Sequence, residues 1–216
     1  MKYNPPMDKR RYVQRRRAES AQQTRERILD AARSSLRSGP LNAVKVDDIA
    51  REAEVARSTL YVLFGSRAGL FEALAVDLLE HGGFDRLVAA FRLPDARTAL
   101  LESLGAGTEA YANEPDLARS ILTLAATDPD AAVAVRRFEH GRWPGMRNIA
   151  GRLESQGYLR GDMSRDEAAQ ILWVLTSFAT FDQLFRERGL SAAGVTDRLR
   201  AMAERTLLRA PRPDAP

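Results

Sequence analysis

Apolar residues recur at helical spacing along most of the chain, whereas the alternating runs that mark strands are absent. The first four predicted helices are short, and the second and third are joined by only a few residues around "EVAR". Their apolar stripes are Ile28, Ala31, Ala32 and Leu36; Val46, Ile49, Ala50 and Ala53; Leu60, Leu63 and Phe64; and Leu70, Phe71, Leu74, Leu78 and Leu79. Gly39-Pro40 is expected to end the first helix and Gly82-Gly83 the fourth. The pattern predicts an all-α protein.

Longer helices are predicted further along, over 96–111, 115–126, 129–155, 164–188 and 191–208. Proline and glycine residues mark the joints between them. Ser164 with Glu167 predicts a capping box for one of these helices, and Ser20 with Gln23 predicts one for the first helix of the chain. Pro144 has no N–H group, so we expect it to kink or split the helix over 129–155.

The stretch "VDDIAREAEVARSTLYVLFGSRAGLFEAL" carries the most specific chemistry in the chain. Two short helices with a tight joint, the second opening with small polar and cationic side chains, form a helix-turn-helix arrangement. The second helix is expected to place its N-terminal residues against base edges in the major groove of DNA. A generic three-helix cluster with a solvated polar face is the alternative. The candidates for DNA contacts in and around this stretch are Lys45, Arg57, Ser58, Thr59, Tyr61 and Arg67.

Each of these side chains suits a particular contact. Arg57 can donate a fork of hydrogen bonds to guanine, and Tyr61 can place its hydroxyl on a phosphate. Ser58 and Thr59 can reach bases or phosphates. Arg67 begins the fourth helix, where its cation and the unpaired N–H groups of the first turn would form an anion site.

Charge and composition narrow the function classes. The net charge is +4, and residues 1–20 alone hold seven Lys or Arg against two acids. A basic arm at the front is typical of a polyanion-binding protein, and a solvated tail is the alternative. The chain has no cysteine and only two distant histidines, His81 and His140, so we predict no metal site and no cofactor.

The sequence also gives no support for an enzyme or for a membrane or secreted protein. No acid, base and nucleophile converge and no glycine-rich phosphate loop is present, so an enzyme is not expected. No apolar run of about 18 residues exists for a membrane span. The basic N-terminus is not followed by the apolar stretch of a secretory signal. We therefore expect a cytoplasmic protein without a membrane partner.

From Thr24 to Leu74 the sequence resembles the DNA-binding region of the TetR/AcrR family of transcriptional regulators. The matching pieces are "TRERILDAA" and the helix-turn-helix stretch quoted above. Further along, "GYLRGDMSRDEAAQILWVLTS" and "RERGLS" resemble, more loosely, the penultimate helix of the family's regulatory domain. The resemblance implies an all-helical homodimer. Its N-terminal domains would read a palindromic operator on double-stranded DNA, and its C-terminal domains would dimerise and hold a small-molecule pocket.

This resemblance gives the expected organisation of the chain. A basic flexible arm over 1–20 precedes the helix-turn-helix DNA-binding domain over 21–80. A larger helical regulatory and dimerisation domain covers 81–210, and a disordered tail covers 211–216. The last arginines of the arm, which would reach phosphates or the minor groove, are Arg15, Arg16 and Arg17.

The sequence departs from the family at three places. Glu54 stands where the family usually has glycine in the turn, and a left-handed backbone there would cost about 1–2 kcal/mol. Lys45 replaces the usual Ser or Thr cap of the second helix, which loses about 1 kcal/mol but adds a cation near the DNA backbone. Val62 and Leu63 follow the tyrosine where a polar or aromatic residue is usual. We expect them to be buried, with contact to a thymine methyl as the alternative.

Candidates in the second half follow from the family's architecture. Aromatic and apolar residues between the central helices are candidates for an effector pocket: Tyr111, Leu122, Phe138, Trp143 and Trp173. The apolar faces of the last two predicted helices are candidates for a four-helix dimer interface, with intramolecular core as the alternative: Leu172, Leu175, Ala179, Val195, Leu199 and Met202.

The function predicted from the sequence is a DNA-binding transcriptional repressor. It would bind its operator as a homodimer and be released by a small-molecule effector. The alternative is a helical protein–protein adaptor with weakened or lost DNA binding, which the departures at Glu54 and Lys45 keep open.

Overall fold

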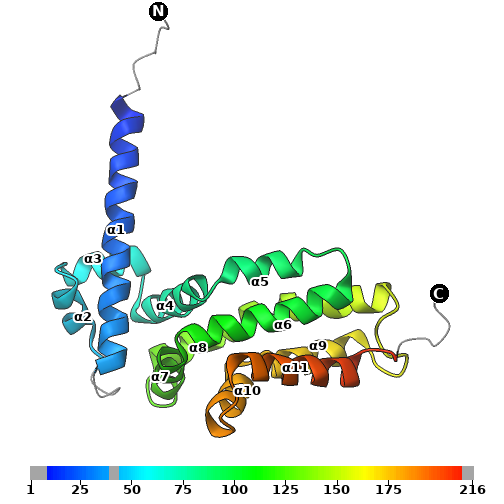
Figure 1. Cartoon of the computed structure of the whole chain (residues 1–216). Coiled ribbons are helices and arrows are strands. Elements are labelled where there is room, and N and C mark those ends of the chain that lie inside the picture. Colours follow the sequence, from blue (N-terminus) through cyan, green and yellow to red (C-terminus); the bar gives the residue numbers. More distant parts are fainter. Residues whose placement is uncertain (1–8, 39–43, 211–216) are drawn as a thin grey trace, which may run out of the picture. The chain divides into compact units, whose positions relative to one another are not determined.

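The computed structural model describes residues 9–38 and 44–210 (Figure 1), and their regular elements are helices. The all-α prediction is confirmed. The predicted tail over 211–216, the first eight residues of the predicted arm and Gly39-Pro40 lie outside the described residues. The elements are α1 (Lys9–Ser38), α2 (Val46–Glu52), α3 (Arg57–Phe64), α4 (Arg67–His81), α5 (Phe84–Phe91), α6 (Ala96–Asn113), α7 (Pro115–Ala125), α8 (Pro129–Ser155), α9 (Arg165–Leu175), α10 (Phe178–Asp182), a π-helical turn (Gln183–Glu187) and α11 (Ala192–Leu207).

The helices form two compact units. The first unit contains α1, α2, α3, the start of α4 as far as Leu74, and the segment Ser120–Ala134 around the α7–α8 turn. The second unit contains Ala75–Arg119 and the chain from Val135 onward. The division therefore falls within α4, α7 and α8, and the first unit is built from two separate stretches of chain.

The core of the first unit contains the predicted apolar stripes of α1, α2, α3 and the start of α4. Leu60 of α3 is fully buried, as are Ile28 of α1 and Leu70 of α4. Ala50 and Ala53 are buried at the end of α2, where their small side chains let the neighbouring helices approach closely. Burial of this kind contributes roughly 2 kcal/mol to stability for each large apolar side chain. It anchors α3 by one face only.

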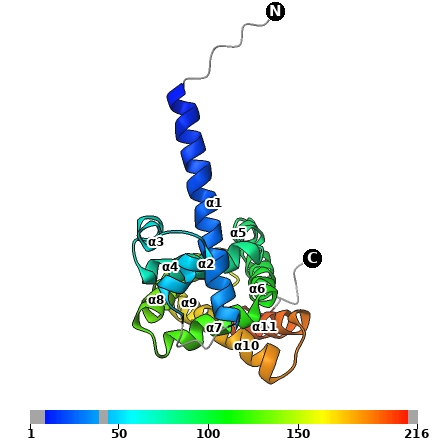
Figure 2. The same ribbon diagram turned by 90° about the vertical axis from the view of Figure 1, so that its left-hand side faces the viewer.

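Helix α1 begins at Lys9, so the predictions of a flexible arm up to residue 20 and of a helix start at Ser20 are wrong. Its N-terminal end projects past α2 and α3 (Figure 2). Pairs four residues apart support it: Arg15 donates to Glu19 at 2.8 Å, and the Thr24 hydroxyl donates to the Ser20 carbonyl at 2.8 Å. Because the packed half of α1 has already formed a helix, extending it requires no new nucleation.

In the second unit α5 and α11 both pack against α6, and α9 packs against α11. The predicted helices over 96–111, 115–126, 129–155 and 191–208 are confirmed within two residues at each end, and the Ser164–Glu167 capping box is present. Helix α5 was not predicted. Helix α8 runs on through Pro144, so it does not split there.

The single helix predicted over 164–188 is wrong, because α9 ends at Leu175 and α10 begins at Phe178. The Ser177 side chain accepts a hydrogen bond from the Thr180 N–H at 3.1 Å and caps α10. The Thr176 hydroxyl donates to the Leu172 carbonyl at 2.7 Å. Side chains therefore bond to the backbone on both sides of the break.

Candidate functional site

The turn between α2 and α3 is a regular helix C-terminus in which Glu54 occupies the left-handed position. Its φ is 53°, and among the described residues it alone has a positive φ without being glycine. The Glu54 N–H donates to the Arg51 carbonyl at 3.1 Å, and the Val55 N–H donates to the Ala50 carbonyl at 2.9 Å. These two bonds are those of a Schellman motif. The turn therefore keeps a standard geometry in spite of its non-glycine residue.

The start of α2 lacks a side-chain cap, as the sequence predicted. Lys45 occupies the capping position with an extended backbone, and its side chain makes no capping hydrogen bond. Asp47 and Asp48 lie in that turn, where their negative charges offset part of the loss by facing the positive end of the helix dipole.

Helix α3 exposes a mixed polar and apolar face. Ser58 and Tyr61 are exposed, and Thr59 is half-buried beside them. Val62 is 82% exposed, so the expected burial of this residue is wrong, while Leu63 is half-buried. Leu60 is the one buried residue of α3, and Ser58, Tyr61 and Val62 are open to a partner.

Arg57 is held within the helix-turn-helix by two neighbours. Its guanidinium donates to the Asp47 carboxylate at 3.0 Å and to the Tyr61 hydroxyl at 3.2 Å. It also lies over the Tyr61 ring, 5.6 Å from the centroid. The hydrogen bond with Tyr61 and the charge of Asp47 raise the pKa of Arg57 above its usual value. Sequence reasoning missed Asp47, because nothing in the sequence marks a pairing across ten positions.

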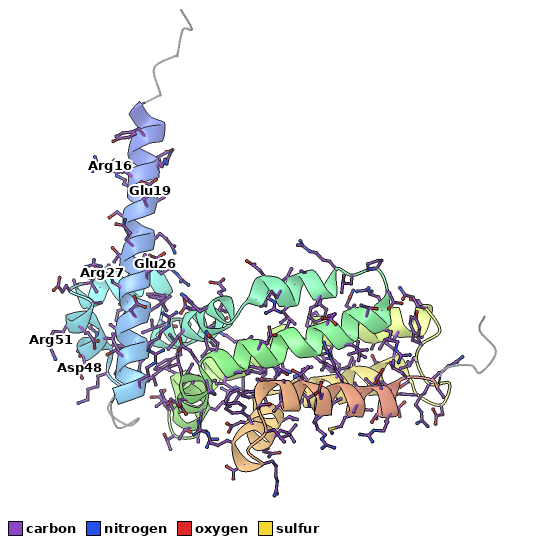
Figure 3. The ribbon with its side chains drawn as sticks, viewed as in Figure 1. Arg16, Glu19, Glu26, Arg27, Asp48 and Arg51 are labelled. Atoms are coloured by element: carbon purple, nitrogen blue, oxygen red, sulfur yellow. The ribbon has the colours of Figure 1, made fainter. Side chains whose placement is uncertain are left out.

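A shallow groove runs between the N-terminal half of α1 and the exposed face of α3. Arg16 and Arg17 line it, whereas Arg15 is paired with Glu19 and lies outside it. Figure 3 shows Arg16 and Glu19 on the part of α1 that projects past α3. The residues that line the groove are Tyr12, Arg16, Arg17, Ser20, Ala21 and Thr24 of α1 and Ser58, Thr59, Val62 and Leu63 of α3. The structure thus brings two of the three predicted arm arginines next to the predicted reading helix.

Arg67 makes contacts inside the first unit, which contradicts its predicted role as part of a free anion site. Its guanidinium donates to the Asp128 carboxylate at 2.6 Å, to Asp130 at 3.3 Å and to the Val44 carbonyl at 3.0 Å. The side chains of Arg67 and Asp128 are only 22% and 17% exposed. Two carboxylates already neutralise this cation, so a phosphate would have to displace them.

The second unit holds a cavity of about 370 Å³ between α5, α6, α8, α9, α10 and α11. Two of the predicted pocket residues, Tyr111 and Phe138, line it. Leu122, Trp143 and Trp173 do not line this cavity, and their place in an effector pocket stays a prediction. Periodicity placed all five on helices without showing which way each one faces.

The polar groups of the cavity are mostly engaged with the protein. The Tyr111 hydroxyl donates to the Thr176 carbonyl at 3.4 Å, and burial raises the pKa of Tyr111. Arg142 donates to the Thr176 hydroxyl at 2.7 Å and forms an ion pair with Glu139. Sequence reasoning missed Arg142, although its spacing of three from Glu139 on a predicted helix was an available signal.

Four of the six predicted dimer-interface residues are core residues of the second unit. Leu172, Leu175, Val195 and Leu199 are buried, so their assignment to an interface is wrong. Ala179 and Met202 are exposed. A helix that faces its own core has the same apolar periodicity as one that faces a partner, so the sequence could not separate them.

The described part of the chain holds no single-helix candidate for a membrane span and no candidate metal cluster. No single helix there is both long enough and apolar enough to cross a membrane; α3 and the first part of α4 meet the test only as a pair bent by 65°. Within the same residues, no three His, Asp or Glu side chains gather in a way that could hold a metal ion.

Comparison with known proteins agrees with this geometry. Residues 28–74 match the model of the TetR family of bacterial regulatory proteins. A stretch of 64 residues is 41% identical to the HTH-type transcriptional regulator AlkX of Mycobacterium tuberculosis. That stretch spans 30% of this chain and 28% of AlkX, so the relative is matched over less than a third of its length.

Solved structures extend the likeness over most of the chain. A TetR-family transcriptional regulator from Rhodococcus sp. superposes with a TM-score of 0.69 at 16% identity, covering 86% of this chain and 99% of that one. NalD of Pseudomonas aeruginosa, the secondary repressor of the MexAB-OprM multidrug efflux pump, gives 0.66 at 23% identity, covering 88% and 98%. At these identities the likeness shows a shared fold. Residues 28–74 therefore carry the N-terminal domain of the TetR family of bacterial regulatory proteins, and the chain shares the fold of TetR-family regulators over most of its length.

Proposed function

We propose that this protein is a transcriptional repressor that binds a palindromic operator as a homodimer and leaves it when a small molecule enters the second unit. The observation that carries the proposal is the exposed face of α3. Ser58, Tyr61 and Val62 are open to solvent on a helix that Leu60 anchors from the opposite side. A helix held in this way can enter the major groove of DNA, which admits one helix.

The N-terminal half of α1 would make the second contact with DNA. Arg16 and Arg17 share a groove with α3, so both would approach the duplex together. Their charges suit phosphates, and neutralising phosphates makes binding depend on salt. Val62, beside Ser58 in the groove, suits the methyl group of a thymine.

A homodimer would supply the second reading helix. Val174 on α9 is 55% exposed and Met202 on α11 is 38% exposed. Together with the exposed Ala179, they give the last helices apolar surface outside the core. A two-fold axis through this surface would pair two copies, and a symmetric dimer reads a palindromic site.

Release by a small molecule is supported by the cavity of the second unit. Its volume of about 370 Å³ and its mainly apolar lining fall within the range of ligand sites. Repression is supported by the shared fold with NalD, which is itself a repressor. The regular turn at Glu54 weighs against the alternative of an adaptor that has lost DNA binding, because it leaves α3 in a standard helix-turn-helix geometry.

The test is selection of binding sites from random double-stranded DNA by the full chain, together with sedimentation of the free and DNA-bound protein. We expect enrichment of a palindrome whose half-sites lie about one helical turn apart and binding by a dimer. Enrichment of no palindrome, or a strictly monomeric protein, would contradict the proposal.

A paired variant tests the contribution of α1. Arg16→Gln with Arg17→Gln should flatten the salt dependence of operator binding by roughly two counterions per protomer, or about four for the dimer. The matched control is Arg27→Gln, which removes an exposed charge of α1 outside the groove and should change the slope less. If wild type and both variants show the same salt dependence of operator binding, the contact between α1 and DNA is removed from the proposal.

A further inference from the structure

The cavity of the second unit is lined by apolar side chains from six helices. Among them are Phe91 of α5, Leu104 of α6, Met146 and Ile149 of α8, and Phe181 of α10. Because one water occupies about 30 Å³ in the liquid, a cavity of about 370 Å³ holds roughly a dozen non-hydrogen atoms. Its walls therefore suit a medium-length apolar chain or a small ring system.

Only one residue that lines the cavity carries a charge, and that charge is compensated. Arg142 lines it, and Glu139 on the same helix forms an ion pair with Arg142. The two side chains are 12% and 23% exposed, so solvent screens the pair only weakly. A carboxylate ligand would compete with Glu139 for the guanidinium, and a cationic ligand would find no carboxylate in the lining.

The hydrogen-bonding groups of the lining point to an acceptor on the ligand. The hydroxyls of Ser103 and Thr108 donate to carbonyls of their own helix, and that of Tyr111 donates to Thr176. Arg142 donates to Glu139, to the Trp173 carbonyl and to the Thr176 hydroxyl. A guanidinium has further N–H donors beyond these three, so Arg142 can still serve a ligand oxygen.

We propose that the cavity binds an uncharged, medium-chain amphiphile whose single acceptor oxygen, as in an ester, aldehyde or ketone, lies at Arg142. This assignment rests on the proposed effector-controlled function, for which it names the class of effector. The apolar chain would fill the space between α5, α6 and α8. The ion pair with Glu139 selects against a free carboxylate head group.

The closing experiment compares three probes of similar chain length and different head-group charge: methyl decanoate, decanoate and decyltrimethylammonium, each below its micelle concentration. Trp143 and Trp173 are the chain's two tryptophans, one adjacent to Arg142 in sequence and one bonded to it, so their fluorescence reports binding without DNA. We expect methyl decanoate to bind at least about tenfold tighter than the other two, a difference of about 1.4 kcal/mol. Equal or tighter binding of either charged probe, or no binding of any probe to folded protein, would overturn the assignment.

Two variants locate the ligand. Gly107 lines the cavity and a methyl group added there meets no atom within 4 Å, so the larger side chain of Gly107→Leu would enter the cavity and should abolish binding. Gly107→Ala is the matched control: it gains the same helix propensity, fills little space and should bind within about twofold of wild type. Normal binding by a folded Gly107→Leu protein would place the ligand elsewhere and overturn the proposal.

The nearly isosteric Glu139→Gln variant tests the role of the ion pair. Because no carboxylate then neutralises the charge of Arg142, the variant should bind decanoate in preference to methyl decanoate. If the preference is unchanged, the ion pair does not select the head group of the ligand.

Operator release is measured separately: if methyl decanoate binds without lowering operator affinity, the ligand class stands and the effector function fails. If decanoate binds and releases the operator, the function stands and the ligand class fails.

Discussion

The guanidinium of Arg57 at the start of α3 lies 3.0 Å from the carboxylate of Asp47 on α2, so the two helices of the helix-turn-helix are joined through the residue expected to read DNA. A guanine edge or a phosphate would compete with this carboxylate for Arg57, because all three accept hydrogen bonds from its guanidinium. We therefore expect Asp47 to act on DNA recognition through Arg57.

The Asp47→Asn variant should bind random-sequence DNA more tightly, by roughly threefold to tenfold at low salt, and should discriminate its operator less well. Arg57 would lose the competitor that makes non-specific contacts unfavourable, and an acid would be removed near the phosphates. Fluorescence anisotropy with operator and scrambled duplexes at several salt concentrations measures both effects.

Asp48→Asn is the matched control, because it removes the same charge one position away. Asp48 pairs with Arg51 at 2.9 Å on α2 (Figure 3), whereas Arg57 pairs with Asp47. It should change both affinities equally and leave discrimination intact. If Asp47→Asn and Asp48→Asn behave alike, Asp47 acts only through its charge.

Replacing Glu54 by glycine should stabilise the protein by roughly 0.5–1 kcal/mol. The left-handed backbone at φ 53° costs a residue with a Cβ atom about 1–2 kcal/mol, and the larger entropy of glycine in the unfolded chain cancels part of that gain. Urea unfolding measures the change. Glu52→Gly, which places glycine inside α2, should instead destabilise by about 1 kcal/mol. Destabilisation by both substitutions would mean that the Glu54 side chain contributes contacts of its own.

Arg67→Gln should lower the stability of the protein by roughly 1–3 kcal/mol, because it leaves the half-buried Asp128 without its cation. Desolvation alone would raise the pKa of Asp128, but hydrogen bonds from the Ala131 N–H and from Arg67 lower it overall. The exposed Arg51→Gln variant should cost less than about 0.5 kcal/mol. A flatter salt dependence of operator binding with unchanged stability would instead support the phosphate contact predicted from the sequence.

Stability should depend on pH through Asp95, which caps α6. Its carboxylate accepts hydrogen bonds from the Thr98 hydroxyl, the Tyr158 hydroxyl and the Thr98 N–H, which lower its pKa to about 2. The value in the unfolded chain is about 3.9, so the contribution is complete above that pH and is lost as the pH falls towards 2. Asp95→Ala should cost about 1 kcal/mol at pH 7.

Urea unfolding of wild type and Asp95→Ala between pH 7 and pH 3 measures this dependence. The difference between the two proteins should shrink at the acid end. Asp197→Ala, which removes an exposed aspartate of α11, should show no such trend. A constant difference at every pH would mean that the Asp95 side chain stabilises the protein by packing instead of by its charge.

Sequence reasoning succeeded for helices whose ends carry their own signals. Pro115 and Pro129 begin α7 and α8, and Ser164 with Glu167 caps α9, so those starts were predictable. The extension of α1 was missed because its arginines and glutamines have no apolar stripe. This extension is helical because it continues a helix whose C-terminal part is packed in the core. The break at Ser177 was missed because apolar residues continue on both sides of it.

The residues of the candidate site were likewise predictable only where their signals lie close together in the sequence. The reading helix could be predicted because its function depends on adjacent residues. The partners of Arg57 and Arg67 lie 10 and 61 positions away, and only the folded chain brings them together. The exposure of Val62 depends on which side of α3 meets the core, and a helix of eight residues shows that weakly in its sequence.

The bond between Arg67 and Asp128 has a consequence for the engineering of hybrid regulators. The DNA-reading head is encoded in two pieces, residues up to Leu74 and Ser120–Ala134. A graft of the first piece alone would leave Arg67 beside whatever side chains the recipient protein supplies at its own α7–α8 turn. A working chimaera must therefore transplant both pieces, or rebuild the acidic turn in the recipient, before its operator preference can be compared with that of the donor.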